Sequence, residues 1–254
     1  GYGYLFCWDL YTGEEQWRAL FDTQAGAYLA PLVVEQGVYI SSDTGSYGGM
    51  VGLDVSSGKS LWAVENIGTY ASWAPTYANG RLYTHLGQSF CERDITTGKA
   101  RWCKTVPWFG WAMNSAPVIS EGRALVVGSD ALYAHDLDGH SGTLWFRSGD
   151  WRERLPAIAE GVVYALNPTN LRALRLTDGE ILWTFESDPG PVHAPIVTRD
   201  FVYVASPQTT YVLQRTTGES VWQTDHGGWL TVASGYLYIA QGDQTIYAYR
   251  AQEP

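Results

Sequence analysis

Short runs of alternating apolar and polar residues, separated by glycine-containing turns, extend along the whole chain. One example is Met50-Val51-Gly52-Leu53, which is followed by Asp54-Val55-Ser56-Ser57-Gly58 and then by a second run that carries Trp62. Alternation with a period of two favours a half-buried strand, and glycine accepts the positive φ that a tight turn requires. This stretch therefore predicts a β-hairpin with Trp62 on its second strand.

The hairpin pattern occurs six times. Each copy ends on a tryptophan, and successive tryptophans are 38–45 residues apart: Trp17, Trp62, Trp102, Trp145, Trp183 and Trp222. In three copies an aspartate stands four residues before the glycine, where its carboxylate could accept hydrogen bonds from turn N–H groups: Asp9, Asp54 and Asp94. A fixed period near 40 residues indicates a repeat architecture.

A second strand–turn–strand unit precedes the hairpin in each repeat. Its signature is a proline eight residues before a tyrosine: Pro31 and Tyr39, Pro75 and Tyr83, Pro156 and Tyr164, Pro195 and Tyr203. Each repeat therefore holds four short strands, which we call A, B, C and D in chain order, with the tryptophan on strand D. Four strands in about 40–45 residues correspond to one blade of a β-propeller.

The number of complete repeats sets the predicted blade count. Sets with all four strands span residues 28–66, 73–106, 115–148, 155–187 and 194–225. Residues 1–21 hold only a C–D hairpin, and residues 229–250 hold only A, B and a C-like strand. We predict one all-β domain over residues 1–254, a β-propeller of four-stranded antiparallel blades. Six blades is the preferred count, because the terminal strands could complete one blade and closure removes exposed sheet edges. The alternative is seven or eight blades with terminal strands missing.

The repeat also resembles a known family. The pattern Asp-x-x-Thr-Gly-x-x-x-Trp, preceded by Ala-Pro-x-Val and Val-Tyr-Val, is similar to the tryptophan-docking repeat of the quinoprotein (PQQ-type) β-propellers, and the likeness covers essentially the whole chain. In that family the tryptophan packs between neighbouring blades, so the resemblance implies this docking role for the six tryptophans. Arg175 and Gln214 replace the aspartate in two copies, and the fourth copy has one extra residue before its glycine.

Charge and hydropathy exclude some classes of partner. The formal net charge is −10 and only 17% of residues are charged, which argues against nucleic-acid binding and against adsorption to anionic membranes. No run of 18 apolar residues is present, so we predict no direct membrane insertion. The sequence starts with neither an initiator Met nor a signal peptide, from which we expect a mature form or an excised domain.

The cysteines give information on the cellular compartment of the protein. Cys91 and Cys103 flank one C–D turn symmetrically about Thr97, so they could face each other across the hairpin. The two interpretations are a disulfide and a pair of reduced thiols. Disulfides are typical of secreted domains and rare in cytosolic ones. We expect an extracytoplasmic location, either periplasmic or secreted.

Aromatic residues gather in the D–A segments, which open on one face of a propeller. Five of the six tryptophans that are not docking residues lie there. The predicted binding residues of this face are Tyr28, Tyr70, Trp73, Trp108, Trp111, Trp151, Arg152, His193 and Trp229. An aromatic-lined mouth is typical of ligand and protein-binding surfaces. The alternative interpretation is that these side chains plug the central channel.

The preferred function is a non-catalytic propeller that binds a protein, a peptide or a glycan, or acts as a scaffold. The quinoprotein dehydrogenases that the repeat resembles bind PQQ and calcium, and two adjacent cysteines in a disulfide are their hallmark. No two cysteines are adjacent here and the histidines show no metal spacing, so we predict no catalytic residue, metal or cofactor. The resemblance is nearer to non-catalytic relatives, such as periplasmic scaffold subunits of outer-membrane assembly. The alternatives are a cofactor-dependent oxidoreductase or a lyase/hydrolase acting in the central mouth, and a structural module of a larger protein.

Overall fold

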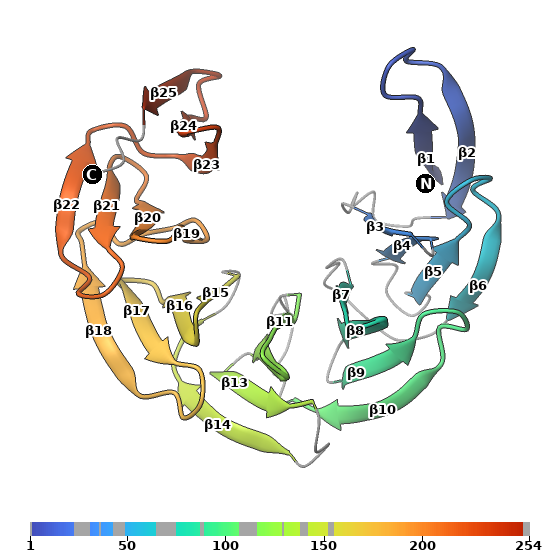
Figure 1. The fold of residues 1–254 in the computed structure, drawn as a ribbon, viewed down its shortest axis with the longest axis horizontal. Helices are drawn as coiled ribbons and strands as arrows, with labels where there is room; N and C mark the ends of the chain where they lie inside the picture. The colour runs from blue at the N-terminus through green and yellow to red at the C-terminus, as the bar shows by residue number, and fades with distance from the viewer. Residues whose placement is uncertain are drawn as a thin grey trace. The chain divides into compact units, whose positions relative to one another are not determined.

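Every regular element in the described part of the chain is a β-strand. The computed structural model describes residues 2–22, 31–35, 37–42, 49–64, 75–86, 89–106, 116–128, 130–137, 142–151 and 155–250. These residues form 25 strands in seven antiparallel sheets, and the strands within each sheet follow chain order (Figure 1). No helix that could cross a membrane occurs among the described residues.

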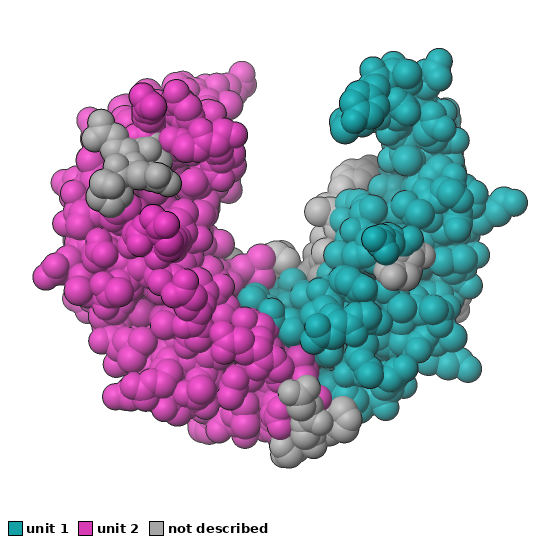
Figure 2. All heavy atoms as spheres, in the orientation of Figure 1, with its two compact units in different colours: residues 1–119, 126–129 teal, residues 120–125, 130–254 magenta. Residues whose placement is uncertain are grey.

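The chain divides into two compact units, which Figure 2 shows in different colours. Unit 1 consists of residues 1–119 and 126–129, and unit 2 of residues 120–125 and 130–254. Three sheets lie wholly in unit 1. They are β1 (Tyr2–Trp8) and β2 (Glu15–Asp22); β3 (Leu32–Val34), β4 (Gly37–Ser42), β5 (Gly49–Leu53) and β6 (Ser60–Val64); and β7 (Thr76–Ala78), β8 (Arg81–Leu86), β9 (Ser89–Asp94) and β10 (Ala100–Thr105).

Three sheets lie wholly in unit 2. They are β15 (Ala157–Ala159), β16 (Val162–Leu166), β17 (Asn170–Arg175) and β18 (Ile181–Glu186); β19 (Ile196–Val197), β20 (Phe201–Ala205), β21 (Thr210–Gln214) and β22 (Ser220–Thr224); and β23 (Trp229–Ala233), β24 (Tyr236–Ala240) and β25 (Ile246–Arg250). The remaining sheet has residues in both units and contains β11 (Val118–Ser120), β12 (Arg123–Val127), β13 (Ala131–Asp136) and β14 (Thr143–Ser148).

The A–B turns have the conformation that their sequence predicts. Asn79 and Gly80 both have positive φ, of 51° and 75°, and so do Glu160 and Gly161, of 47° and 72°. Two successive residues with positive φ make a two-residue hairpin whose twist matches that of the flanking strands. The turn sets the register, in which the residue after the proline pairs with the tyrosine, as Thr76 does with Tyr83.

The C–D turns confirm the role predicted for the aspartates. Asp54 Oδ1 accepts hydrogen bonds from the backbone N–H groups of Ser56 (3.1 Å) and Ser57 (2.8 Å), and the N–H of Gly58 donates to the Asp54 carbonyl (2.9 Å). Gly58 has a φ of +67°. Where Arg175 replaces the aspartate, the N–H of the corresponding glycine still donates to the Arg175 carbonyl, at 2.8 Å. The backbone turn therefore forms without the carboxylate.

Four tryptophans dock on the next sheet in the way the family resemblance implies. In each, the indole N–H donates at 2.9–3.0 Å to a backbone carbonyl in the C–D turn of the next sheet, one residue after the position that Asp54 occupies in its own turn. The ring lies against the glycine of the same turn. The pairs are Trp17 with Val55 and Gly58, Trp62 with Ile95 and Gly98, Trp145 with Leu176 and Gly179, and Trp183 with Arg215 and Gly218.

Trp102 and Trp222 differ from these four. The indole N–H of Trp102 donates to Glu92 Oε2 in its own sheet, at 3.2 Å. Trp222 is 38% exposed, and its ring meets Tyr249 edge-on with centroids 5.1 Å apart. The structure describes this docking geometry at four of the six positions, and the turn of the sheet after Trp102 includes residues 138–141, which lie outside the described ranges.

The hydrophobic core lies between successive sheets. Tyr39, Met50 and Trp62 cluster with Leu82 and Ile95 of the following sheet in unit 1. Burial of this apolar area between sheets is the main force that holds the repeats together.

The prediction of an all-β propeller with four-stranded antiparallel blades is confirmed. Its blade count differs from the preferred one, because the structure has seven sheets: five with four strands, one with three and one with two. This count matches the alternative of seven blades. One repeat pattern continues through both units, and on that basis we keep a single propeller domain as a prediction.

Candidate functional site

Most of the predicted D–A face lies outside the described residues. This applies to Tyr28, Tyr70, Trp73, Trp108, Trp111 and Arg152. The structure describes the other three members, Trp151, His193 and Trp229, all of which belong to unit 2.

Trp151 is enclosed by its surroundings. Only 1% of its surface is exposed, and its indole N–H donates to the carbonyl of Arg147 at 2.9 Å. The guanidinium of Arg172 lies over the ring, 5.7 Å from its centroid. These contacts satisfy the polar atom and cover the ring, as in the packing role that was the alternative for the aromatic face.

Trp229 and His193 form an accessible aromatic pair. Trp229 is the first residue of β23 and is 60% exposed, while His193 lies in the segment before β19 and is half-buried. Their ring centroids are 4.7 Å apart with an interplanar angle of 36°. A pairing with Ala240 of β24 holds Trp229 in the sheet, so the exposed indole is presented by a rigid element.

An apolar groove of about 400 Å³ lies between the sheet β19–β22 and the sheet β23–β25, next to Trp222 of β22. Its lining includes Phe201, Trp222, Leu237, Tyr249 and Arg250. Sequence reasoning did not identify this groove, because it depends on how closely Trp222 approaches the next sheet.

A polar network surrounds the hydroxyl of Tyr249, whose side chain lines the groove. Tyr249 Oη lies 2.7 Å from His226 Nδ1 and 3.0 Å from Thr224 Oγ1, and the His226 ring stacks on Tyr247 with centroids 3.7 Å apart. These contacts tie β25 to the segment after β22. They satisfy the hydroxyl and imidazole groups within the protein, which is typical of a structural histidine.

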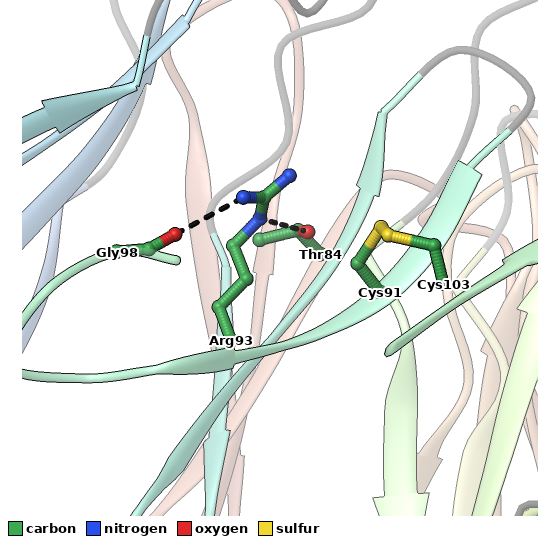
Figure 3. Close-up of a disulfide and its surroundings, with 5 residues drawn as sticks. All are labelled: Thr84, Cys91, Arg93, Gly98 and Cys103. Atoms are coloured by element: carbon green, nitrogen blue, oxygen red, sulfur yellow. Dashed lines mark hydrogen bonds between the residues drawn. A yellow bond between two sulfur atoms is a disulfide. The ribbon is translucent and has the colours of Figure 1, made fainter. Parts of the chain in front are cut away.

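The cysteine pair forms a disulfide across the hairpin of β9 and β10 (Figure 3). Arg93, two residues from Cys91, is 6% exposed and donates to Thr84 Oγ1 (3.1 Å) and to the carbonyl of Gly98 (3.0 Å). Burial lowers the pKa of its guanidinium. Arg93 thus holds the turn on which Trp62 docks. The disulfide covalently links β9 and β10, the two strands that flank this turn.

Candidate metal-binding and catalytic side chains are few in the described ranges. No three His, Cys, Asp or Glu side chains lie close enough together there to hold a metal ion. Glu92 is buried, but Arg81, Tyr83 and Trp102 all contact its carboxylate.

Comparisons with known proteins agree on the fold. A family model described as outer membrane protein assembly factor BamB matches residues 1–184 and 48–253. Among solved structures, BamB from Moraxella catarrhalis is similar with a TM-score of 0.78 and 17% identity, over 98% of this chain and 79% of that one. The computationally designed Ika8 protein has a TM-score of 0.75 and 14% identity, over 96% of this chain and 76% of that one.

An enzyme is also among the similar structures. The quinohemoprotein alcohol dehydrogenase ADHIIG from Pseudomonas putida HK5 has a TM-score of 0.68 and 13% identity, over 93% of this chain and 59% of that one. At such identities the likeness concerns the fold alone. No curated protein matches the sequence. Because the two family-model matches together run from residue 1 to residue 253, this chain belongs to the PQQ-type repeat propeller family described as outer membrane protein assembly factor BamB.

Proposed function

We propose that this protein is a non-catalytic scaffold that binds other proteins outside the cytoplasm. The observation that carries the proposal is the Trp229–His193 pair, an indole that is 60% exposed on a rigid strand and lies 4.7 Å from an imidazole, centroid to centroid. Tryptophan is enriched among the residues that dominate protein–protein binding energy, because it offers a large apolar area and one polar N–H group.

The sequence adds further members to this surface. Tyr28, Tyr70, Trp73, Trp108, Trp111 and Arg152 occupy D–A segments of other repeats and stay predicted contact residues. The ligand class that fits Trp229 and His193 is a polypeptide segment with an apolar side chain for the indole and a hydrogen-bond acceptor for the imidazole. A peptide or a glycan would use the same two groups.

Two observations support an extracytoplasmic scaffold. The disulfide between Cys91 and Cys103 is of a kind that persists in oxidising compartments. The family model carries the description of an outer membrane protein assembly factor, which favours partners of the cell envelope.

Binding to an unfolded outer-membrane β-barrel protein, diluted from denaturant onto the immobilised full chain, tests the proposal. Trp229→Ala should weaken binding at least about 30-fold, the effect of losing a contact worth 2 kcal/mol or more. Leu182→Ala is the matched control, because Leu182 is an exposed apolar residue (43%) of the same unit. It should leave affinity unchanged.

Two results would contradict the proposal. If the wild-type chain does not bind the barrel protein, the partner class is wrong, and the same assay with peptidoglycan fragments tests the glycan alternative. If Trp229→Ala and Leu182→Ala behave alike, the contact surface lies elsewhere. The oxidoreductase alternative would gain support from a quinone absorbance band that co-purifies with the chain.

A further inference from the structure

The disulfide of Cys91 and Cys103 lies on one face of the sheet β7–β10. Cys91 pairs with Thr84 of β8 and with Cys103 of β10, and directly opposite residues of antiparallel strands share a face. Leu82, two residues before Thr84, lies on the same face and clusters with Trp62 of the sheet β3–β6. The disulfide is therefore on the face that packs toward the preceding sheet. Both sheets belong wholly to unit 1, and neither is the first or the last of the seven.

The two halves of the disulfide differ in accessibility. Cys91 belongs to β9, which is paired on both sides, and it is only 1% exposed. Cys103 belongs to β10, an edge strand of the sheet, and it is exposed to solvent. Among the described residues, no strand pairs with the outer side of β10. A thiol in solution can therefore approach the disulfide from the side of Cys103 and not from that of Cys91.

A buried cation lies beside the enclosed half of the disulfide (Figure 3). Arg93, which is 6% exposed, is two residues from Cys91 in β9, so its side chain is on the same face. Its Nε donates at 3.1 Å to Oγ1 of Thr84, the residue directly opposite Cys91. A guanidinium stays charged in a protein, and a positive charge next to a cysteine stabilises its thiolate. Cys91 is thus placed to leave as a thiolate when the disulfide is opened.

The same hairpin carries a contact between sheets. Arg93 also donates from Nη1 to the carbonyl of Gly98 at 3.0 Å. Trp62 of the preceding sheet packs on Gly98 and donates to the carbonyl of Ile95. The strands that the disulfide joins therefore hold a docking turn, so a change in their covalent link reaches the contact between the sheets β3–β6 and β7–β10.

We propose that Cys91 and Cys103 form a thiol–disulfide exchange site at which a dithiol reduces the folded protein. Exposed disulfides are the ones open to such exchange. A thiolate of the dithiol attacks Sγ of Cys103, the bond between the two sulfur atoms breaks, and Cys91 leaves as a thiolate that takes a proton from water. The second thiol of the dithiol then attacks the mixed disulfide and releases Cys103 as a thiol. Two electrons and two protons pass to the protein, and the dithiol becomes a disulfide.

This inference goes beyond the proposed scaffold function. Reduction removes the covalent link of the hairpin that holds the docking turn of Trp62, while Cys91 and Cys103 stay paired by the register of β9 and β10. The stability of unit 1 would then depend on an external reductant.

Single-thiol variants test which sulfur is reached. In a Cys7→Ala background, Cys91→Ala leaves Cys103 as the only thiol, and Cys103→Ala leaves Cys91. Oxidised glutathione, followed by intact mass, should modify Cys103 at least about 100-fold faster than Cys91 in the folded protein, because only Cys103 is exposed. In urea, where both side chains are exposed, the two rates should become similar.

Reduction kinetics distinguish exchange in the folded protein from exchange after unfolding. The full chain carrying Cys7→Ala is treated with dithiothreitol, a small dithiol, or with reduced thioredoxin, a protein dithiol, and new thiols are trapped and counted by mass. The rate should be independent of urea below the unfolding transition, since no opening of the hairpin is needed. A disulfide reached only through unfolding would show a rate that rises steeply with urea, in proportion to the unfolded fraction. Reduction by both reagents would assign a protein dithiol, and reduction by dithiothreitol alone a small one.

Variants of Arg93 give opposite signs for the two routes. Arg93→Gln removes the charge beside Cys91 and also the hydrogen bonds that hold the turn. Exchange in the folded protein should become about three- to tenfold slower, because the leaving thiolate loses its counter-charge, whereas exchange through unfolding should become faster. Arg93→Lys keeps the charge and should restore much of the rate. Arg18→Gln is the matched control, since Arg18 is an exposed arginine of the same unit, and it should leave the rate unchanged.

Three results would overturn the inference. They are equal modification of Cys91 and Cys103 in the folded protein, a reduction rate that rises steeply with urea, and faster reduction of Arg93→Gln. Each would mean that the disulfide is a purely structural link that is reached only when the chain unfolds. Barrel-protein binding by the oxidised chain is a separate measurement, because Trp229 and His193 lie in unit 2 and take no part in the exchange.

Discussion

The ring of Trp62 lies directly against the Cα of Gly98, in the turn of the following sheet. A Cβ built on Gly98 would lie 2.7 Å from Cζ3 of the indole, well inside van der Waals contact, and the φ of Gly98 is +68°. Glycine is therefore required at this position for two reasons: the positive φ of the backbone, and the space that the ring of Trp62 occupies.

Gly98→Ala should destabilise the protein more than Gly80→Ala. Gly80 also has a positive φ (+75°), but a Cβ there would meet no atom within 4 Å. The backbone strain of about 1–2 kcal/mol is common to both variants, and overpacking against Trp62 adds about 1–3 kcal/mol to Gly98→Ala alone. Urea unfolding of both variants measures the difference, and equal losses would mean that the tight contact is not made in solution.

Trp62→Ala should cost about 3–5 kcal/mol, because Trp62 is 9% exposed and its removal leaves a cavity between two sheets. Trp222→Ala should cost only about 1 kcal/mol, since that ring is 38% exposed and its principal ring contact is the one with Tyr249. Melting temperatures compare the two variants directly. A loss at Trp222 as large as that at Trp62 would show that Trp222 also docks on a turn.

Trp151→Ala and Trp229→Ala should separate packing from binding. Trp151 is 1% exposed and hydrogen-bonded to Arg147, so its removal should cost about 3–5 kcal/mol. Trp229 is 60% exposed, and its removal should cost less than about 1 kcal/mol. Unfolding curves give both values. A large loss for Trp229→Ala would assign that indole to the core and remove the basis for a contact surface there.

Removal of the disulfide by Cys91→Ala and Cys103→Ala together should lower stability by about 2–3 kcal/mol, because the unfolded chain gains the freedom of the closed loop. The two cysteines are 12 residues apart. Cys7→Ala is the control, since Cys7 is a free thiol. The difference between the double variant and the wild type should disappear in reductant, and its persistence there would point to a packing effect.

Acid should weaken the C–D turns through their aspartates. Hydrogen bonds from the hydroxyls of Thr96 and then Thr97 lower the pKa of Asp94 from its ordinary value of 3.8 to about 2. Because the pKa is lower in the folded state, the stabilisation is fully present above about pH 4 and is lost as the pH falls toward 2. Asp94→Asn should reduce the melting temperature at neutral pH and flatten its dependence between pH 4 and pH 2. An unchanged acid slope would mean that Asp94 is not held by these bonds.

The repeat, the strands and the turns could be predicted from the amino-acid sequence. Alternation of apolar residues, the proline–tyrosine spacing and the aspartate–glycine turns are local signals, so the hairpins could be predicted from residues a few positions apart. The docking role of Trp62 was implied by the resemblance of its repeat to a known family, and the facing positions of Cys91 and Cys103 followed from their symmetry about one turn.

Which residues cover each side chain could not be predicted in this way and is seen in the folded protein. Trp151 and Trp229 occupy similar places in their repeats, yet one is enclosed under Arg172 and the other is exposed beside His193. The physical reason is that burial between sheets depends on residues about 40 positions away and on the neighbour that each sheet has, and neither is encoded in the local pattern that specifies a strand or a turn.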